Sequence, residues 1–205
     1  MSIAPPRGKS VASPPPPPPA DAAMLDRCRR QDPIAFRAFV VRHERMVFAL
    51  LSRMLGHGPE VEDLAQETFV RAFRAFPSFD PSGPAKVSTW LLTIAVRLAL
   101  DSRKKRRLDA VPLDSFPNEE VPSLHTPERA LEQRRIGDAL AAAAAQLPDD
   151  QRAALVLAEL HGLSLAEIAG ALEVPENTVK TRLFRAREKM RAALTSRLGT
   201  DWRTS

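Results

Sequence analysis

The sequence of 205 residues contains no tyrosine, a single cysteine and few aromatic residues, which make up 5% of the chain. One cysteine, Cys28, excludes an internal disulfide framework and a cysteine-rich zinc site, and we expect it to be a small buried or half-buried side chain. No glycine-rich phosphate loop and no nucleophile elbow is present. The four histidines lack the spacing of metal ligands: His43, His57, His125 and His161. We therefore expect no metal, no cofactor and no enzymatic activity.

Long apolar runs are absent as well. No apolar stretch approaches the length that crosses a bilayer, and the N-terminus lacks the apolar segment of a secretory signal. These absences predict a cytoplasmic protein with no membrane insertion. The sequence is instead rich in alanine, leucine and arginine, which favours an all-α fold. Its net charge of +5 and pI near 10.0 favour a polyanionic partner.

Changes in composition divide the chain into four segments. Residues 1–22 are rich in proline, cannot bury a core and are expected to be disordered. Residues 23–107 form the larger predicted helical domain. Residues 108–127 contain several prolines and an excess of acidic residues, which is typical of a flexible linker. Residues 128–198 form a smaller predicted helical domain.

Local signals place several helix ends. Asp32 followed by Pro33 is typical of a helix start. Gly56 and Gly162 are predicted to end helices, because glycine adopts the left-handed conformation of a helix stop. Helices are predicted over 59–76, 87–107 and 149–161, the last with Leu155, Val156 and Leu160 as its apolar positions.

The stretch LSLAEIAGALEVPENTVKTRLFRAREKMR, residues 163–191, predicts two helices joined by a short turn. Ser164 and Glu167 have the spacing of a capping box, and Pro175 suits the first turn of the second helix. One face of that second helix is apolar and should be buried: Val179, Leu183, Ala186, Met190 and Leu194. The outer face carries Lys180, Thr181, Phe184 and Arg185. This pattern is typical of a DNA-reading helix-turn-helix, and an ordinary amphipathic hairpin is the alternative.

The outer face of this helix suits the major groove of DNA. Arginine and lysine can contact guanine edges there, and Thr181 can bond to bases or phosphate. Phe184 would meet a thymine methyl, or alternatively pack against the preceding helix. Arg182 and Arg187 flank the face and are expected to contact backbone phosphates.

Two further surfaces are predicted on the N-terminal domain. A cluster of cations ends the helix over 87–107 and should contact phosphates: Arg97, Arg103, Lys104, Lys105, Arg106 and Arg107. Cations that only complement the helix dipole would explain two or three of them. Asp63, Gln66 and Glu67 share one helix face, which suits a basic protein partner or is simply a solvated face.

At these three places the sequence resembles a bacterial sigma factor of the extracytoplasmic-function group. DLAQETFVRAFRAF at 63–76 is similar to that family's core-polymerase-binding helix. STWLLTIAVRLALDSRKKRR at 88–107 is similar to its promoter-melting and minus-ten segment. The stretch from Leu147 to Met190 is similar to its minus-thirty-five reader. Many family members have asparagine where this chain has Arg97.

The resemblance implies a role for each surface. Asp63, Gln66 and Glu67 would dock on the coiled coil of the polymerase's large clamp subunit. The loop over 77–87 and the following helix as far as Trp90 would capture a flipped non-template base, and Arg97, Arg103, Lys104 and Lys105 would contact minus-ten DNA. The minus-thirty-five contacts would come from Lys180, Thr181, Arg182, Phe184, Arg185 and Arg187.

The resulting hypothesis is a two-domain, all-α initiation factor whose partners are core RNA polymerase, promoter DNA and an anti-sigma protein. One alternative is a helix-turn-helix regulator that binds DNA without polymerase. A second alternative is an interaction protein that binds polymerase without starting transcription.

Overall fold

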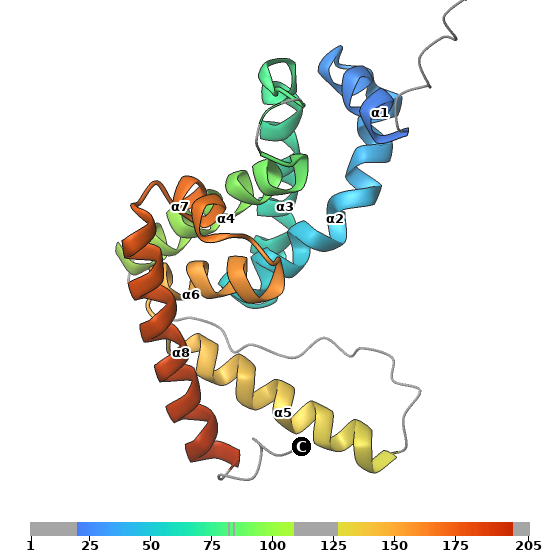
Figure 1. Cartoon of the computed structure of the whole chain (residues 1–205). Coiled ribbons are helices and arrows are strands. Elements are labelled where there is room, and N and C mark those ends of the chain that lie inside the picture. Colours follow the sequence, from blue (N-terminus) through green and yellow to red (C-terminus); the bar gives the residue numbers. More distant parts are fainter. Residues whose placement is uncertain (1–19, 82, 84, 109–126, 199–205) are drawn as a thin grey trace, which may run out of the picture.

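The computed structural model describes residues 20–81, 83, 85–108 and 127–198, which form a set of packed helices with no strand among them (Figure 1). The predicted all-α fold is therefore confirmed. Most of the proline-rich tail and of the acidic linker lies outside the described residues. The α-helices are α1 (Ala20–Arg29), α2 (Pro33–Leu55), α3 (Pro59–Ala75), α4 (Val87–Leu108), α5 (Pro127–Ala145), α6 (Asp149–Leu155), α7 (Leu165–Leu172) and α8 (Glu176–Leu198). A 3₁₀ turn, η1 (Phe76–Ser78), follows α3, and a π-helical turn, η2 (Val156–Leu160), follows α6.

The helix ends arise from the local chemistry that the sequence indicates. Asp32 Oδ1 accepts the backbone N–H groups of Ile34 at 2.9 Å and Ala35 at 3.3 Å, which satisfies two free donors at the start of α2. Gly56 ends α2 with a φ of 92°, and Gly162 ends η2 with a φ of 65°. Ser164 and Glu167 form both halves of the predicted capping box at the start of α7.

An aromatic cluster fills the end of the N-terminal domain near the loop after α3. The ring of Phe76 contacts the ring of Phe39 with centroids 5.0 Å apart and the ring of Trp90 with centroids 5.2 Å apart. Phe36 joins the cluster through Phe73, at 4.9 Å. These edge-to-face contacts join α2, α3 and α4, so the start of α4 is held in a fixed place relative to the loop.

The π-helical turn η2 changes which residues of its segment are buried. The 3.6-residue period predicts Leu160 as a buried position, but its side chain is 47% exposed, whereas Leu157 is fully buried. An i→i+5 turn inserts an extra residue into the helix and rotates the following positions. The prediction was therefore wrong at Leu160 because the helix changes its period at this point.

The N-terminal and C-terminal helices pack against each other and share one hydrophobic core, which includes Phe39 and Leu91 from the first group and Leu157 and Ile168 from the second. Figure 1 shows α7 lying against α4, and contacts also join α2 with η2 and α4 with α6. Helix α5 and the C-terminal half of α8 extend away from this bundle (Figure 1). The two predicted helical groups thus form a closed arrangement.

Candidate nucleic-acid interface

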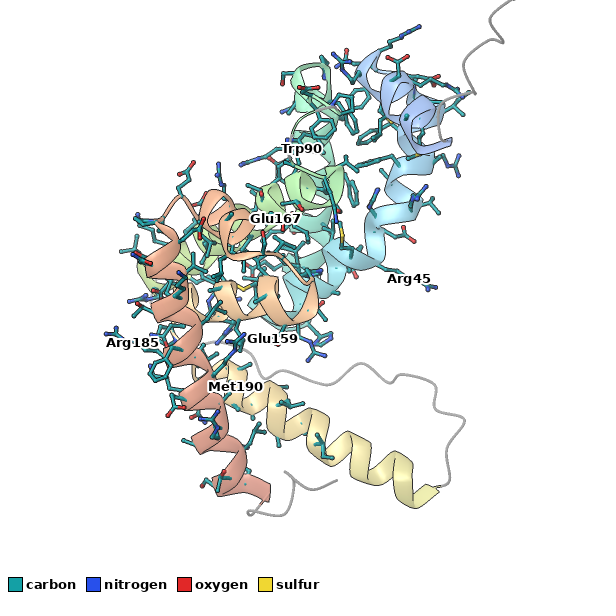
Figure 2. The ribbon with its side chains drawn as sticks, in the orientation of Figure 1. Arg45, Trp90, Glu159, Glu167, Arg185 and Met190 are labelled. Atoms are coloured by element: carbon teal, nitrogen blue, oxygen red, sulfur yellow. The ribbon has the colours of Figure 1, made fainter. Side chains whose placement is uncertain are left out.

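Helix α8 presents the outer face that the sequence predicts. Its inner residues Val179, Leu183 and Ala186 are buried, and α8 contacts α5, α6 and α7. Phe184 is 67% exposed, so it does not pack against the preceding helix. Arg185 points away from the rest of the molecule (Figure 2). Exposed polar and aromatic groups therefore lie together on one face of a rigid helix, the geometry that groove reading requires.

The two flanking arginines of α8 are engaged by acidic residues in the structure. Arg182 Nε lies 3.0 Å from Asp150 Oδ2, and Arg187 Nη2 lies 2.7 Å from Glu159 Oε1. These acids belong to α6 and η2, so both pairs also fix α8 on the preceding helices. Arg187 is exposed, and its pair would compete only weakly with a phosphate.

The cationic end of α4 is divided between exposed and paired residues. Lys104 and Lys105 are exposed. Arg106 Nη1 lies 2.6 Å from Glu60 Oε2 on α3. Arg103 is buried and paired with Asp149 of α6. Of the cations predicted to contact phosphates at this end, the two lysines are therefore exposed, whereas Arg103 is not available in this arrangement.

Arg97 is bonded to α7, although the sequence predicts it to contact DNA, and its side chain stays 44% exposed. Its Nε donates to the backbone oxygen of Ala171 at 3.0 Å, and its Nη2 donates to that of Gly170 at 3.2 Å. Its Nη1 lies 3.1 Å from Glu173 Oε1. The guanidinium thus binds the C-terminal end of α7, where free carbonyl groups and the helix dipole favour a cation.

Glu167 makes a second polar link between α7 and α4. Thr89 Oγ1 donates to Glu167 Oε1 at 2.9 Å, and Oε2 of the same carboxylate accepts the backbone N–H of Ser164 at 2.9 Å. The hydrogen bonds from Ser164, with that from Thr89, lower the pKa of Glu167. Figure 2 places Glu167 where α7 meets α4.

The backbone carbonyl of Met54, at the end of α2, accepts hydrogen bonds from arginines of both helical groups. Arg103 Nη1 donates to it at 2.9 Å and Arg152 Nη1 at 3.0 Å. Arg152 also donates to the carbonyls of Ala145 at 2.6 Å and Leu147 at 3.5 Å. Burial, followed by the charge of Arg103, lowers the pKa of Arg152 to about 10, so it remains a cation at neutral pH.

The predicted polar patch lies on α3. Asp63 and Gln66 are exposed. Glu67 is half-buried and accepts a hydrogen bond from Arg71 Nε at 2.7 Å, one turn along the helix. Sequence reasoning placed these three side chains on one face, and the structure brings them together there.

Trp90 stands where α4 begins and forms one wall of the aromatic cluster (Figure 2). It is half-buried, and its ring lies 4.9 Å from that of Phe79, which is buried. A partly open aromatic surface beside the loop after η1 offers a stacking platform for an unpaired base.

Neither a metal site nor a membrane span is found in the part of the chain that the structure describes. No three histidine, cysteine or acidic side chains gather there to hold a metal ion. No described helix is long and apolar enough to cross a membrane. Cys28 is free and buried, as the sequence predicts.

Two family models match the chain. Sigma-70 region 2 matches residues 39–108, which include α3 and α4, and Sigma-70, region 4 matches residues 137–190, which include the helix pair α7–α8. The chain belongs to the sigma-70 family of RNA polymerase sigma factors. It is a sigma factor of the extracytoplasmic-function type, and so a transcription initiation factor that works with core RNA polymerase at promoter DNA.

Similar proteins cover most of this sigma factor. It is 34% identical over 182 residues to the RNA polymerase sigma-H factor of Pseudomonas aeruginosa, which covers 85% of this chain and 93% of the relative. It is 35% identical over 176 residues to the ECF RNA polymerase sigma-E factor of Escherichia coli K12, which covers 82% and 91%.

Solved structures share the fold. CnrH in complex with the cytosolic domain of CnrY matches with a TM-score of 0.60 and 27% identity, covering 87% of this chain and 99% of that one. RpoE from Bartonella quintana, in complex with the anti-sigma factor NepR, matches with a TM-score of 0.63 and 22% identity, covering 78% and 96%.

Sequence reasoning missed the residues that close the two helical groups on each other. Thr89, Asp149 and Arg152 were not singled out. The available signal at Arg152 was its place in α6 just before a run of apolar residues, since a guanidinium that becomes buried needs several acceptors. For Thr89 and Asp149 no local pattern distinguishes the contact.

Proposed function

We propose that three surfaces of this sigma factor divide its work. The patch of Asp63, Gln66 and Glu67 docks on core polymerase. Trp90 and the exposed lysines of α4 bind the opened minus-ten DNA. The outer face of α8 reads the minus-thirty-five element. The exposed face of α8 carries this proposal, because the aromatic side chain of Phe184 is 67% exposed and stands beside the exposed cations Lys180 and Arg185.

The binding of single-stranded DNA follows from the aromatic platform at Trp90. An unpaired base can stack there, while Lys104 and Lys105 attract the adjoining phosphates. Stacking stabilises the opened strand without any covalent step, so this surface assists melting by selective binding. The two DNA-binding surfaces of the sigma factor, on α4 and on α8, are each small. Holding both on one polymerase would raise their combined affinity for the promoter.

We infer that a further protein controls this sigma factor by holding the closed arrangement. Arg97 and Thr89 are occupied by α7 in this arrangement, so the minus-ten surface is partly covered while the face of α8 is open. Solved relatives with similar folds are bound to an anti-sigma factor or to another protein's cytosolic domain, which supports a partner of this kind. The site of action is expected to be the cytoplasm, where the polymerase works.

Run-off transcription tests the proposal as a whole. Purified full-length protein with core polymerase should give discrete transcripts from genomic promoter fragments. Core enzyme alone provides the background. Tight operator binding without polymerase, together with no transcript in its presence, would favour a conventional helix-turn-helix regulator.

The α8 face is tested at Arg185. Arg185→Ala should reduce promoter affinity by about 1–3 kcal/mol and relax discrimination at particular upstream base pairs, because a bidentate contact to a base edge is lost. Competition binding over a library of upstream sequences measures this. An equal loss on all sequences would instead identify Arg185 as a phosphate contact.

The α3 patch is tested by charge reversal. Asp63→Arg with Glu67→Arg should abolish capture of core polymerase without changing helicity. Glu44→Arg is the control, since Glu44 is an exposed acidic residue on a different helix, α2. Retained capture by the double variant would place the docking surface elsewhere.

A further inference from the structure

Two arginines of α8, Arg182 and Arg187, flank its buried face. They are five residues apart, so they lie about 140° apart around the helix, with the buried face between them. Arg182 is paired with Asp150 of α6, and Arg187 with Glu159 of η2. The side chain of Arg182 is 23% exposed, whereas those of Arg187 and Glu159 are 56% and 57% exposed. The first pair is therefore part of the packed structure, and the second is open to exchange.

Glu159 engages one edge of the Arg187 guanidinium. Its Oε1 accepts a hydrogen bond from Nε at 3.0 Å and another from Nη2 at 2.7 Å. Two neighbouring N–H groups of this kind are also what a guanidinium presents to the oxygens of a phosphate. The carboxylate of Glu159 and a DNA phosphate therefore compete for the same edge of Arg187.

The cations on the outer face of α8 are not held in this way. Lys180 and Arg185 are exposed, and neither has an acidic partner among the residues that the structure describes. Figure 2 shows Arg185 and Glu159 on opposite sides of α8. The cations proposed to read bases are thus free, while Arg187, which suits a backbone phosphate, is held by an acid.

Attachment of α8 to the preceding helices does not account for the pair of Arg187 and Glu159. Ion pairs between exposed side chains change an equilibrium constant by only about 1.4- to fivefold. The helix is already anchored by buried residues such as Val179, and by the more buried pair of Arg182. An effect on DNA binding is more direct, because a phosphate contact by Arg187 would add affinity for every DNA sequence.

We propose that Glu159 lowers the sequence-independent affinity of α8 for DNA, because it occupies the edge of Arg187 that would otherwise bind a backbone phosphate. This inference rests on the proposed role of α8 as the reader of the minus-thirty-five element. When the phosphate contact is weakened, the base contacts supply a larger share of the binding. Stable binding then depends on the correct sequence and on the polymerase that holds the sigma factor at the promoter.

Direct DNA binding by the full-length chain tests the proposal. Fluorescence anisotropy measures its affinity for two labelled duplexes, the upstream part of a promoter fragment that gives a run-off transcript and the same bases in scrambled order. Glu159→Gln keeps the size of the side chain and removes its charge. It should tighten binding to both duplexes by about two- to fivefold, as expected when an exposed ion pair no longer competes. Misfolding cannot produce such a gain.

The salt dependence gives a second readout. A further phosphate contact releases further counterions, so the slope of log K against log salt concentration should become steeper in Glu159→Gln by up to about 0.9. A pair that only held α8 in place would leave this slope unchanged.

Asp150→Asn is the matched control. It removes the same charge from the other pair, but Arg182 stays largely covered by the fold, so no comparable gain is expected. Arg187→Ala completes the comparison. It should cost little affinity in the natural protein and about two- to fivefold in the Glu159→Gln background, because only there is the guanidinium free to bind phosphate.

Three results would overturn the proposal. Unchanged or weaker binding by a folded Glu159→Gln would show that the pair positions Arg187 or holds α8. A gain that persists in the Arg187→Ala background, or an equal gain in Asp150→Asn, would show that only the general loss of negative charge matters. A gain on one duplex alone would assign Glu159 to base reading.

Arg185→Ala in the same assay separates this proposal from the proposed function. If Arg185→Ala weakens binding to the promoter duplex while Glu159→Gln changes nothing, α8 remains the DNA reader and only the role of Glu159 is overturned. If neither variant changes binding, the role of α8 is overturned, and this inference with it.

Discussion

The carboxylate of Glu167 takes part in two structures, a helix cap and a contact between helices. It completes the capping box of α7 through Ser164, and it accepts a hydrogen bond from Thr89 of α4. The first role is local and visible in the sequence as a serine followed three residues later by glutamate. The second joins residues 78 positions apart and has no local signal.

The pKa of Glu167 predicts how stability depends on pH. The folded state lowers this pKa below the ordinary value of 4.5, so the folded state binds the proton less readily than the unfolded state. The stabilisation is complete above that ordinary value and is lost as the pH falls through the lowered pKa. Glu167→Gln keeps a capping side chain but removes this titration.

Urea denaturation should therefore show that the free energy of unfolding falls less on acidification in Glu167→Gln than in the natural protein. Glu62→Gln is the control, since Glu62 is exposed and has no hydrogen-bond partner in the described part of the chain. An equally steep acid loss in Glu167→Gln and the natural protein would show that this carboxylate does not contribute.

Arg152 is predicted to be a major source of stability. Arg152→Ala leaves the carbonyls of Met54, Ala145 and Leu147 without their donor and creates a cavity, which together should lower the free energy of unfolding by about 3 kcal/mol. Arg53→Ala, at an exposed arginine of α2, should change it by less than about 0.5 kcal/mol. Chemical denaturation of both variants measures the difference.

At the scale of elements, helix ends were predictable and helix faces were not always so. Asp32, Gly56 and Ser164 act on their immediate neighbours, so their effect is contained in the sequence beside them. The buried face of η2 depends on a change of helical period that propensity does not signal. At α8 the regular period persists, and the predicted buried stripe is confirmed at Val179, Leu183, Ala186 and Leu194.

The π-helical turn predicts unequal losses of stability for two leucine substitutions. Leu157→Ala should lower the free energy of unfolding by about 2–5 kcal/mol, because its side chain is fully buried in the shared core. Leu160→Ala, three residues later, should cost less than about 1 kcal/mol, because much of its side chain already lies in water. Equal losses in thermal or chemical denaturation would indicate a regular helix through this segment.

For the whole molecule, the sequence predicted two helical groups but not their closed arrangement. The contacts that close it involve Arg97, Thr89 and Arg103, each bonded to residues more than 40 positions away. The same arginines were assigned to DNA from their charge. Charge alone indicates that a cation needs an anionic or carbonyl partner, and it does not indicate which partner the fold supplies.

Reversing the charge of Arg97 should open the closed arrangement of the two helical groups. In Arg97→Glu the new carboxylate faces Glu173 and the carbonyl end of α7, which repel it. The variant should therefore favour separated domains and show a larger radius of gyration in small-angle X-ray scattering. Lys104→Glu makes the same charge change at an exposed site and should leave the radius unchanged. Adding Glu173→Arg to Arg97→Glu should partly restore the compact form. An unchanged radius in Arg97→Glu would show that other contacts hold the domains together.

The acceptor that joins the two halves at Met54 is a backbone oxygen. Because every amino acid carries that atom, no substitution at position 54 deletes it, and changes of the interface through evolution must act on the donors Arg103 and Arg152. Relatives that have lost or gained this link will therefore differ at the two arginines and can look alike at the acceptor. A search for closed sigma factors among sequences should compare the arginine pair and disregard the residue to which it binds.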